Sequence, residues 1–285
     1  MPIDPATHVG PVALRVTDLD RSRDFYSQVL GLQTLDAGDG VAQMSADGRS
    51  ALVELDSRET AGGAPAPPRA TGLFHLALLY PSRAELGQAV QRVLDAGAGL
   101  DGASDHLVSE AIYLHDPDRN GIEIYRDRPR EQWPPPPPGQ SVAMDSIPLD
   151  VGEILAEAAE TNGGADPGTV MGHVHLKVSD LDRSIAFYRD ALGLDLRAQL
   201  GPQAAFLAAG GYHHHVGINV WHSRGGGPPP PGSAGLAWFA LELPSPDALA
   251  ETAGALRDAG HEVEEQDGTV TVRDPDGIAV RLRAS

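Results

Sequence analysis

The chain has 285 residues and a formal net charge of −19, from 40 acidic and 21 basic residues. A surface this acidic repels phosphate backbones and anionic lipids, so we expect neither a nucleic-acid partner nor a membrane partner. Cysteine is absent, which excludes disulfides, thiolate catalysis and cysteine-ligated metals. Signal-peptide and membrane-spanning patterns are lacking, so the expected location is cytoplasmic.

An internal repeat organises the chain. Residues 10–32 contain Asp-Leu-Asp-Arg-Ser, Phe-Tyr and Leu-Gly-Leu in that order, and residues 172–194 contain the same three motifs. A second unit recurs as well, with residues 73–82 aligning with 236–245 and 116–123 with 274–281. The chain therefore consists of four modules, two in each half.

Each module is predicted to form a strand, a helix and further short strands. Apolar and polar residues alternate in 173–178, which is typical of a strand with one buried face. The following Asp180 is an N-cap candidate, and apolar residues then recur at helical spacing. Gly193 can end this helix in the left-handed conformation. The second unit has a corresponding helix at residues 83–96.

A linker separates the two halves. Residues 131–168 contain a run of five prolines, a predicted short helix from Val151 to Ala159 and a predicted loop from Thr161 to Gly168. We therefore expect one domain at residues 1–130 and a second at 169–285.

Three polar residues stand at equivalent strand positions in the repeat. His75 and His173 lie in the first strand of the second and third modules, and Glu123 lies in the last strand of the second. Alternation places Glu123 opposite the apolar Ile122 and Ile124. Polar strand ends without chemistry are the alternative, but two imidazoles and one carboxylate form the ligand set of non-haem Fe(II) oxygenases. We predict a metal site for Fe(II), with Mn(II) as the second choice.

The repeat motifs, together with the ending Gly-Ile-Glu-Ile-Tyr at residues 121–125, resemble the vicinal oxygen chelate superfamily. Residues 102–113 and 211–221 are similar to stretches typical of its catechol 2,3-dioxygenase-like extradiol enzymes. The resemblance implies an α+β fold of four βαβββ modules in two domains, whose curved mixed or antiparallel sheets form half-barrels with the helices outside. The module motif alone indicates the fold more than the function, because lyases, isomerases, dioxygenases and binding proteins share it.

The resemblance also implies how the modules pair. Two modules of this superfamily form one half-barrel, and the ligands come from their first and last strands. At these positions the first module has Pro11, and the fourth has Trp238 and Arg281. Pairing within each half would leave both ligand sets incomplete. We infer that the second module pairs with the third, which gives one metal per chain between the halves. The first and fourth modules then form a pair that holds no metal, although the first module contains Glu54. Completion across a homo-oligomer is the alternative.

The resemblance assigns two further roles. It implies that His106 is the acid/base and that Tyr113 hydrogen-bonds the substrate oxygen. Ser104 and Arg119 depart from the family pattern, Arg119 replacing a glycine. We expect the segment Asn120-Gly121 to supply the left-handed turn instead.

Alternation adds candidates for substrate contact. His175 shares the face of the first-strand ligand in its module. With the apolar residues of 216–220 on the core face, alternation places His213, His215 and Asn219 on the pocket face. We predict that these side chains line the pocket without binding the metal.

The leading functional hypothesis is an extradiol ring-cleavage dioxygenase that acts on catechol or a substituted catechol with dioxygen. A glyoxalase-type lyase or isomerase is the enzyme alternative. It would use a redox-inert metal and no oxygen. The non-enzyme alternative is a protein that sequesters an aromatic ligand. The ligand set argues against the binding protein, and the His106/Tyr113 segment argues against the lyase.

Overall fold

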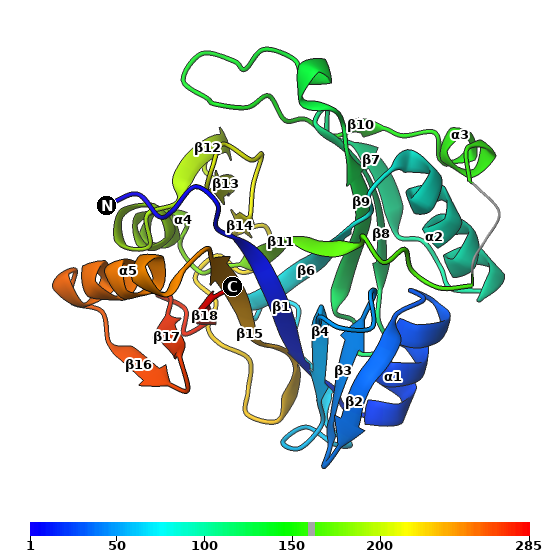
Figure 1. The fold of residues 1–285 in the computed structure, drawn as a ribbon, viewed down its shortest axis with the longest axis horizontal. Helices are drawn as coiled ribbons and strands as arrows, with labels where there is room; N and C mark the ends of the chain where they lie inside the picture. Colours follow the sequence, from blue (N-terminus) through cyan, green and yellow to red (C-terminus); the bar gives the residue numbers. More distant parts are fainter. Residues whose placement is uncertain (159–162) are drawn as a thin grey trace.

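The computed structural model describes residues 1–158 and 163–285, and each repeat unit within them folds as βαβββ (Figure 1). The first module comprises β1 (His8–Arg15), α1 (Leu19–Gln28), β2 (Gln33–Gly38), β3 (Val41–Ser45) and β4 (Val53–Asp56). The second comprises β6 (Gly72–Leu79), α2 (Arg83–Asp95), β7 (Gly102–Asp105), β8 (Ser109–His115) and β9 (Gly121–Asp127).

The second half repeats this order. The third module comprises β11 (Val170–Lys177), α4 (Leu181–Ile185), which continues as the π-helical turn η2 (Ala186–Ala191), β12 (Asp195–Leu200), β13 (Ala204–Ala208) and β14 (Val216–Asn219). The fourth comprises β15 (Ser233–Leu243), α5 (Pro246–Asp258), β16 (Val263–Gln266), β17 (Thr269–Arg273) and β18 (Ala279–Ala284). No helix in the described part of the chain is long and apolar enough to cross a membrane.

The helices of the modules begin where the sequence places a capping residue. The side chains of Asp18 and Asp180 accept a hydrogen bond from a backbone amide of the first turn. Ser82 and Ser245 do the same at the other two helices. Gly193 follows its helix at φ 89°, as predicted, in a conformation that a side chain would disfavour.

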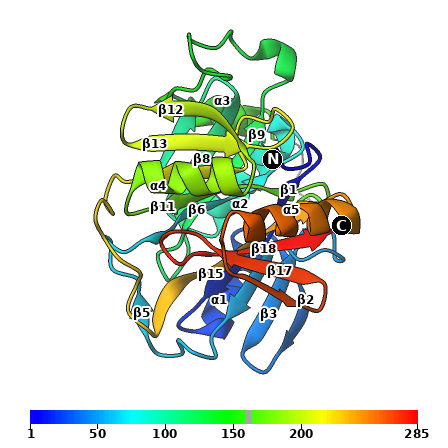
Figure 2. The same cartoon turned by 90° about the vertical axis from the view of Figure 1, so that its left-hand side faces the viewer.

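The strand order joins modules from different halves of the chain. One nine-stranded sheet runs β16-β17-β18-β15-β1-β4-β3-β2, with β5 (Ala64–Pro65) beside β15. The other runs β10-β7-β8-β9-β6-β11-β14-β13-β12, in which β10 is the two-residue strand Ile147–Pro148. The antiparallel pairs β1–β15 and β6–β11 lie side by side across the halves (Figures 1 and 2). This agrees with the predicted pairing of the second module with the third.

The buried faces of both sheets and the helices share one apolar core. It includes Val12 and Phe239 from the first sheet and Leu76 and Val174 from the second. In the first sheet, the ligand positions hold Trp238 and Arg281, whose guanidinium lies 4.0 Å from the indole centroid. A cation–π stack therefore occupies the place that the metal ligands take in the second sheet.

The linker packs onto the second sheet. It contains η1 (Arg130–Gln132), β10 (Ile147–Pro148), which pairs with β7, and α3 (Val151–Ala156). The predicted end of this helix at residue 159 and the predicted start of the loop at residue 161 lie outside the described residues. The boundaries at 130 and 169 separate the two repeats of the sequence. Because each half contributes strands to both sheets, the division into two domains stays a prediction.

Candidate metal centre and active-site pocket

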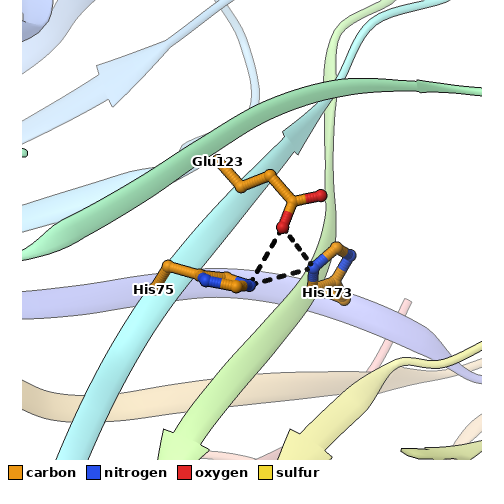
Figure 3. Close-up of side chains that lie close together, drawn as sticks. All are labelled: His75, Glu123 and His173. Atoms are coloured by element: carbon orange, nitrogen blue, oxygen red, sulfur yellow. Dashed lines mark hydrogen bonds and ion pairs between the residues drawn. The ribbon is translucent and has the colours of Figure 1, made fainter. Parts of the chain in front are cut away.

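Three neighbouring strands carry the predicted ligands. In the second sheet β6 lies between β9 and β11, so His75, Glu123 and His173 come from adjacent strands (Figure 3). The Oε2 atom of Glu123 lies 3.0 Å from Nε2 of His75 and 3.4 Å from Nε2 of His173. The two Nε2 atoms are 3.3 Å apart. The structure thus brings all three predicted ligands together.

Burial and the contacts among these groups together set their charge. Glu123 and His173 are 2% and 1% exposed. Burial raises the pKa of Glu123, but the two imidazoles outweigh it and hold that pKa well below its usual value. Burial lowers the pKa of His173 to about 4. Near pH 7 the cluster therefore contains an ionised carboxylate and a neutral His173, the protonation states in which these groups bind a metal.

The cluster fits a divalent ion. Its ligand atoms all lie within 4.8 Å of one another. Three ligands about 2.1 Å from one ion at adjacent octahedral corners would be separated by about 3 Å, close to the observed spacing. Two histidines and one carboxylate on one side of an ion leave its remaining positions open to other molecules.

A cavity of about 490 Å³ opens beside the cluster. Both β6 and β9 contribute to its wall, which includes His75 and Glu123. The aromatic and imidazole side chains that line it are Phe74, His106, Tyr113, His115, His175, Phe206, His214 and Trp221. Residues 144–146 of the linker cover another side. Nine of the 19 lining residues carry an aromatic or imidazole ring, and such rings can pack against a small planar aromatic molecule.

His106 and Tyr113 form a hydrogen-bonded pair in this cavity. The Nδ1 atom of His106 lies 2.7 Å from the carbonyl oxygen of Asp145, and Nε2 lies 2.6 Å from the hydroxyl of Tyr113. Because a carbonyl only accepts, Nδ1 carries the proton and Nε2 accepts from Tyr113. Burial and the nearby Glu123 raise the pKa of Tyr113 well above its usual value, so it stays a phenol. His106 is thereby held with its basic nitrogen toward the cavity.

The other predicted pocket residues divide into two groups. His175 lines the cavity between Phe74 and Trp221, and burial lowers its pKa well below the usual value. His213 and His215 do not line it. The ring of His213 bonds Asp127, and Nδ1 of His215 accepts from the backbone amide of Ala209.

Strand alternation was wrongly extended to these two histidines. Strand β14 begins only at Val216, so residues 213–215 form an irregular turn before it. Asn219 lies in the strand but is fully buried outside the cavity wall, where its Oδ1 accepts from the backbone amide of Trp221. The structure therefore does not agree with the prediction that Asn219 lines the pocket.

His214 is the pocket residue that sequence reasoning missed. It lines the cavity, its ring centroid lies 4.1 Å from that of His173, and its Nδ1 lies 2.8 Å from Nδ1 of His213. Burial lowers its pKa well below the usual value. The run of three histidines indicated that at least one of their rings would line the pocket. Which ring does so depends on the irregular backbone of residues 213–215.

The turn before β9 also corrects a prediction. Arg119 itself takes the left-handed conformation, at φ 66°, whereas Asn120-Gly121 was expected to do so. Its repeat counterpart Gly277 has φ 82°. Gly121 is needed for another reason, since a Cβ there would lie 2.1 Å from the carbonyl oxygen of Phe74. That contact holds β9 close to β6 beside the ligands.

Comparisons with known proteins agree with this architecture. The family described as Glyoxalase/Bleomycin resistance protein/Dioxygenase superfamily matches residues 8–124 and 170–282. A Bacillus subtilis (strain 168) protein named catechol-2,3-dioxygenase is 41% identical over 271 residues, covering 94% of each chain.

Two solved structures show the same fold at low sequence identity. A putative dioxygenase from Bacillus subtilis aligns with a TM-score of 0.66 at 12% identity, covering 100% of this chain and 86% of the other. Glyoxalase I from Zea mays aligns with a TM-score of 0.57 at 19% identity, covering 97% and 92%.

Proposed function

Because the chain belongs to the Glyoxalase/Bleomycin resistance protein/Dioxygenase superfamily, we propose that it is an extradiol dioxygenase that opens the ring of catechol or a substituted catechol. The observation that carries this proposal is the opening of the His75, Glu123 and His173 cluster into an aromatic cavity beside the His106–Tyr113 pair. The Bacillus subtilis relative named catechol-2,3-dioxygenase, similar over nearly its whole length, supports the same reaction.

The resident metal of this proposal is Fe(II), with Mn(II) as the alternative. His75, Glu123 and His173 would hold it. When bound, such an ion lowers the cost of deprotonating a diol and brings the diol and dioxygen together. Glu123 supplies one negative charge, so a dication keeps a net positive charge that favours an anionic diolate.

His106 is proposed to move the substrate proton. Its Nε2 atom, which now accepts a hydrogen bond from Tyr113, becomes free to accept a proton once the Tyr113 hydroxyl turns to the substrate. The carbonyl of Asp145 keeps the proton on Nδ1 and stabilises the imidazolium that forms when Nε2 takes a second one. Tyr113 stays protonated and donates a hydrogen bond to a substrate oxygen.

The opposite wall positions the ring and excludes water. His175 and His214 present imidazoles that burial keeps neutral near pH 7. Phe206 and Trp221 add apolar area, and Met144 of the linker closes the outer side. An aromatic ring held between these side chains exposes its two oxygens only toward the ligand cluster and His106.

Anaerobic reconstitution with Fe(II), followed by catechol and air, tests this proposal. We expect oxygen uptake and a yellow ring-cleavage product. His173→Ala should lose both the bound metal and the product, whereas His8→Ala, which removes an exposed histidine, should keep both. A bound metal without oxygen uptake would replace the proposal with a glyoxalase-type lyase. Tight binding of catechol without any metal would replace it with a sequestering protein.

A further inference from the structure

A second cavity, of about 340 Å³, lies where the ends of strands from both sheets meet. Its wall includes the ends of β1 and β11 and the starts of β6 and β15, which neighbour one another in the fold (Figure 1). The turns around Arg119 and Gly277 complete it. It shares no lining residue with the active-site pocket, so it is a separate site.

The one lysine of the chain faces this cavity. All other basic residues are arginines, and three of them, Arg15, Arg119 and Arg273, line the same cavity as Lys177. With three carboxylates also in the wall, these four cations leave an excess of one positive charge, in a chain of net charge −19. Positive charge concentrated in a recess favours an anionic ligand.

The three carboxylates in the wall already have partners other than Lys177. Asp118 is buried and accepts from Arg21 at 2.7 Å and from the backbone amide of Thr17 at 2.8 Å. Asp276 accepts from the backbone amide of Ser179 at 2.9 Å. The side chain of Glu59 is 82% exposed and forms an ion pair with Arg15, another residue of the wall, at 3.9 Å. None of these carboxylates forms an ion pair with Lys177 among the described residues.

Two polar groups in the wall await a partner. In the part of the chain that the structure describes, Lys177 has neither an ion pair nor a side-chain hydrogen bond, although it is half-buried and burial lowers its pKa. The Oγ1 atom of Thr71 is buried and also lacks a partner there. The buried hydroxyl costs free energy without a partner, whereas the ammonium of Lys177 is open to water. A ligand oxyanion in the cavity would accept a hydrogen bond from this ammonium without displacing an existing ion pair.

We propose that this cavity binds a small oxyanion, a carboxylate or a phosphate compound, held by Lys177 and Arg119. The volume admits a metabolite-sized molecule. A long polyanion is disfavoured because the rest of the surface repels it. The site lies one residue from the catalytic pocket along β6, where Leu73 lines this cavity and Phe74 lines the other.

The single lysine makes occupancy directly measurable. The metal-loaded protein is treated with limiting acetic anhydride, with succinate or inorganic phosphate added, or sodium chloride at equal ionic strength. Mass spectrometry then compares acetylation of Lys177 with that of the N-terminal amine, an internal reference. We expect succinate, phosphate or both to slow Lys177 acetylation at least fivefold with a saturable dose dependence, while the reference rate is unchanged. Which of the two protects identifies the source of the oxyanion.

Two variants separate this site from the metal centre. Arg119→Gly keeps Lys177 and the metal ligands but removes one anchor, so protection should fall toward the chloride level. Arg49→Gln removes an exposed arginine far from the cavity wall and should leave protection intact. Equal rates in all three salts, or equal protection in Arg119→Gly and wild type, would overturn the proposal. Lys177 would then be a lysine whose alkyl chain covers apolar surface while its amine reaches water.

Discussion

The hydrogen bonds of His106 make a sharp test of its proposed role as acid/base. His106→Ala should keep one metal per chain but lower kcat about 10²- to 10⁴-fold, because the proton acceptor is lost while the ligand cluster is intact. Metal analysis and steady-state oxygen uptake measure the two quantities. His8→Ala is the matched control, since His8 is exposed and does not line the cavity. Wild-type turnover in His106→Ala would remove the assignment.

Asp116 should make the stability depend on pH. Burial raises its pKa from 3.8 to about 6. A carboxyl whose folded-state pKa is raised stabilises the fold most when protonated, so this contribution is lost as the pH rises from about 4 through 6. Relative to Asp116→Asn, the unfolding free energy of the wild type should fall by up to about 3 kcal/mol between pH 4 and pH 7. Urea unfolding of both proteins measures this, and a constant difference would contradict the pKa.

At the residue scale, the sequence predicted side chains on regular strands and failed at irregular backbone. Alternation placed Glu123 opposite Ile122 and Ile124, and the strand β9 is indeed regular there. The same rule misplaced His213 and His215 because strand β14 begins only at Val216, after both residues. A period of two has meaning only where the backbone is extended.

At the scale of elements, the equivalent turns before β9 and β18 share Asp-Pro-Asp and first differ at Arg119 and Gly277. Arg119 and Gly277 both have positive φ, which costs a side chain about 1–2 kcal/mol. Arg119→Gly should therefore raise the unfolding free energy by about 1 kcal/mol, and Gly277→Ala should lower it by about as much. Thermal or urea unfolding of the two variants gives the signs. Destabilisation by Arg119→Gly would mean that the arginine side chain offsets the backbone strain.

Helix starts were predictable, but some helix ends were not. Asp180 caps its helix because a carboxylate can accept from the amides of the first turn, a rule that needs only local sequence. The π-helical turn at residues 186–191 was not predicted, since its hydrogen bonds depend on how Phe187 and Tyr188 pack. Local motifs fix the beginning of such a helix, and tertiary packing fixes its path.

For the whole molecule, the crossed pairing makes a prediction about its halves. Residues 1–130 carry His75 and Glu123, and residues 169–285 carry His173. Each half alone should bind Fe(II) weakly, while a mixture should assemble and bind one metal per pair. Size-exclusion chromatography and metal analysis of the separate and mixed halves test this. Tight stoichiometric binding by one half alone would show that its ligand set is complete without the other.

The sheet pairing could be predicted because the ligands had to meet, and no other pairing of four modules collects all three. The linker segment that covers the active-site pocket could not be predicted. Residues 144–146 reach the cavity because β10 pairs with β7, and two residues in a proline-rich linker carry no strand signal of their own. Contacts between distant segments without periodicity leave little trace in a sequence.

The seam between β6 and β11 has a thermodynamic consequence. His75 and Glu123 lie on one side of it and His173 on the other. An ion bound by all three would therefore link the two duplicated halves of the chain. An ion that binds only the assembled protein raises its stability in proportion to the logarithm of the free metal concentration. The supply of that metal in the cell would then govern both the catalytic competence of this protein and the lifetime of its folded state.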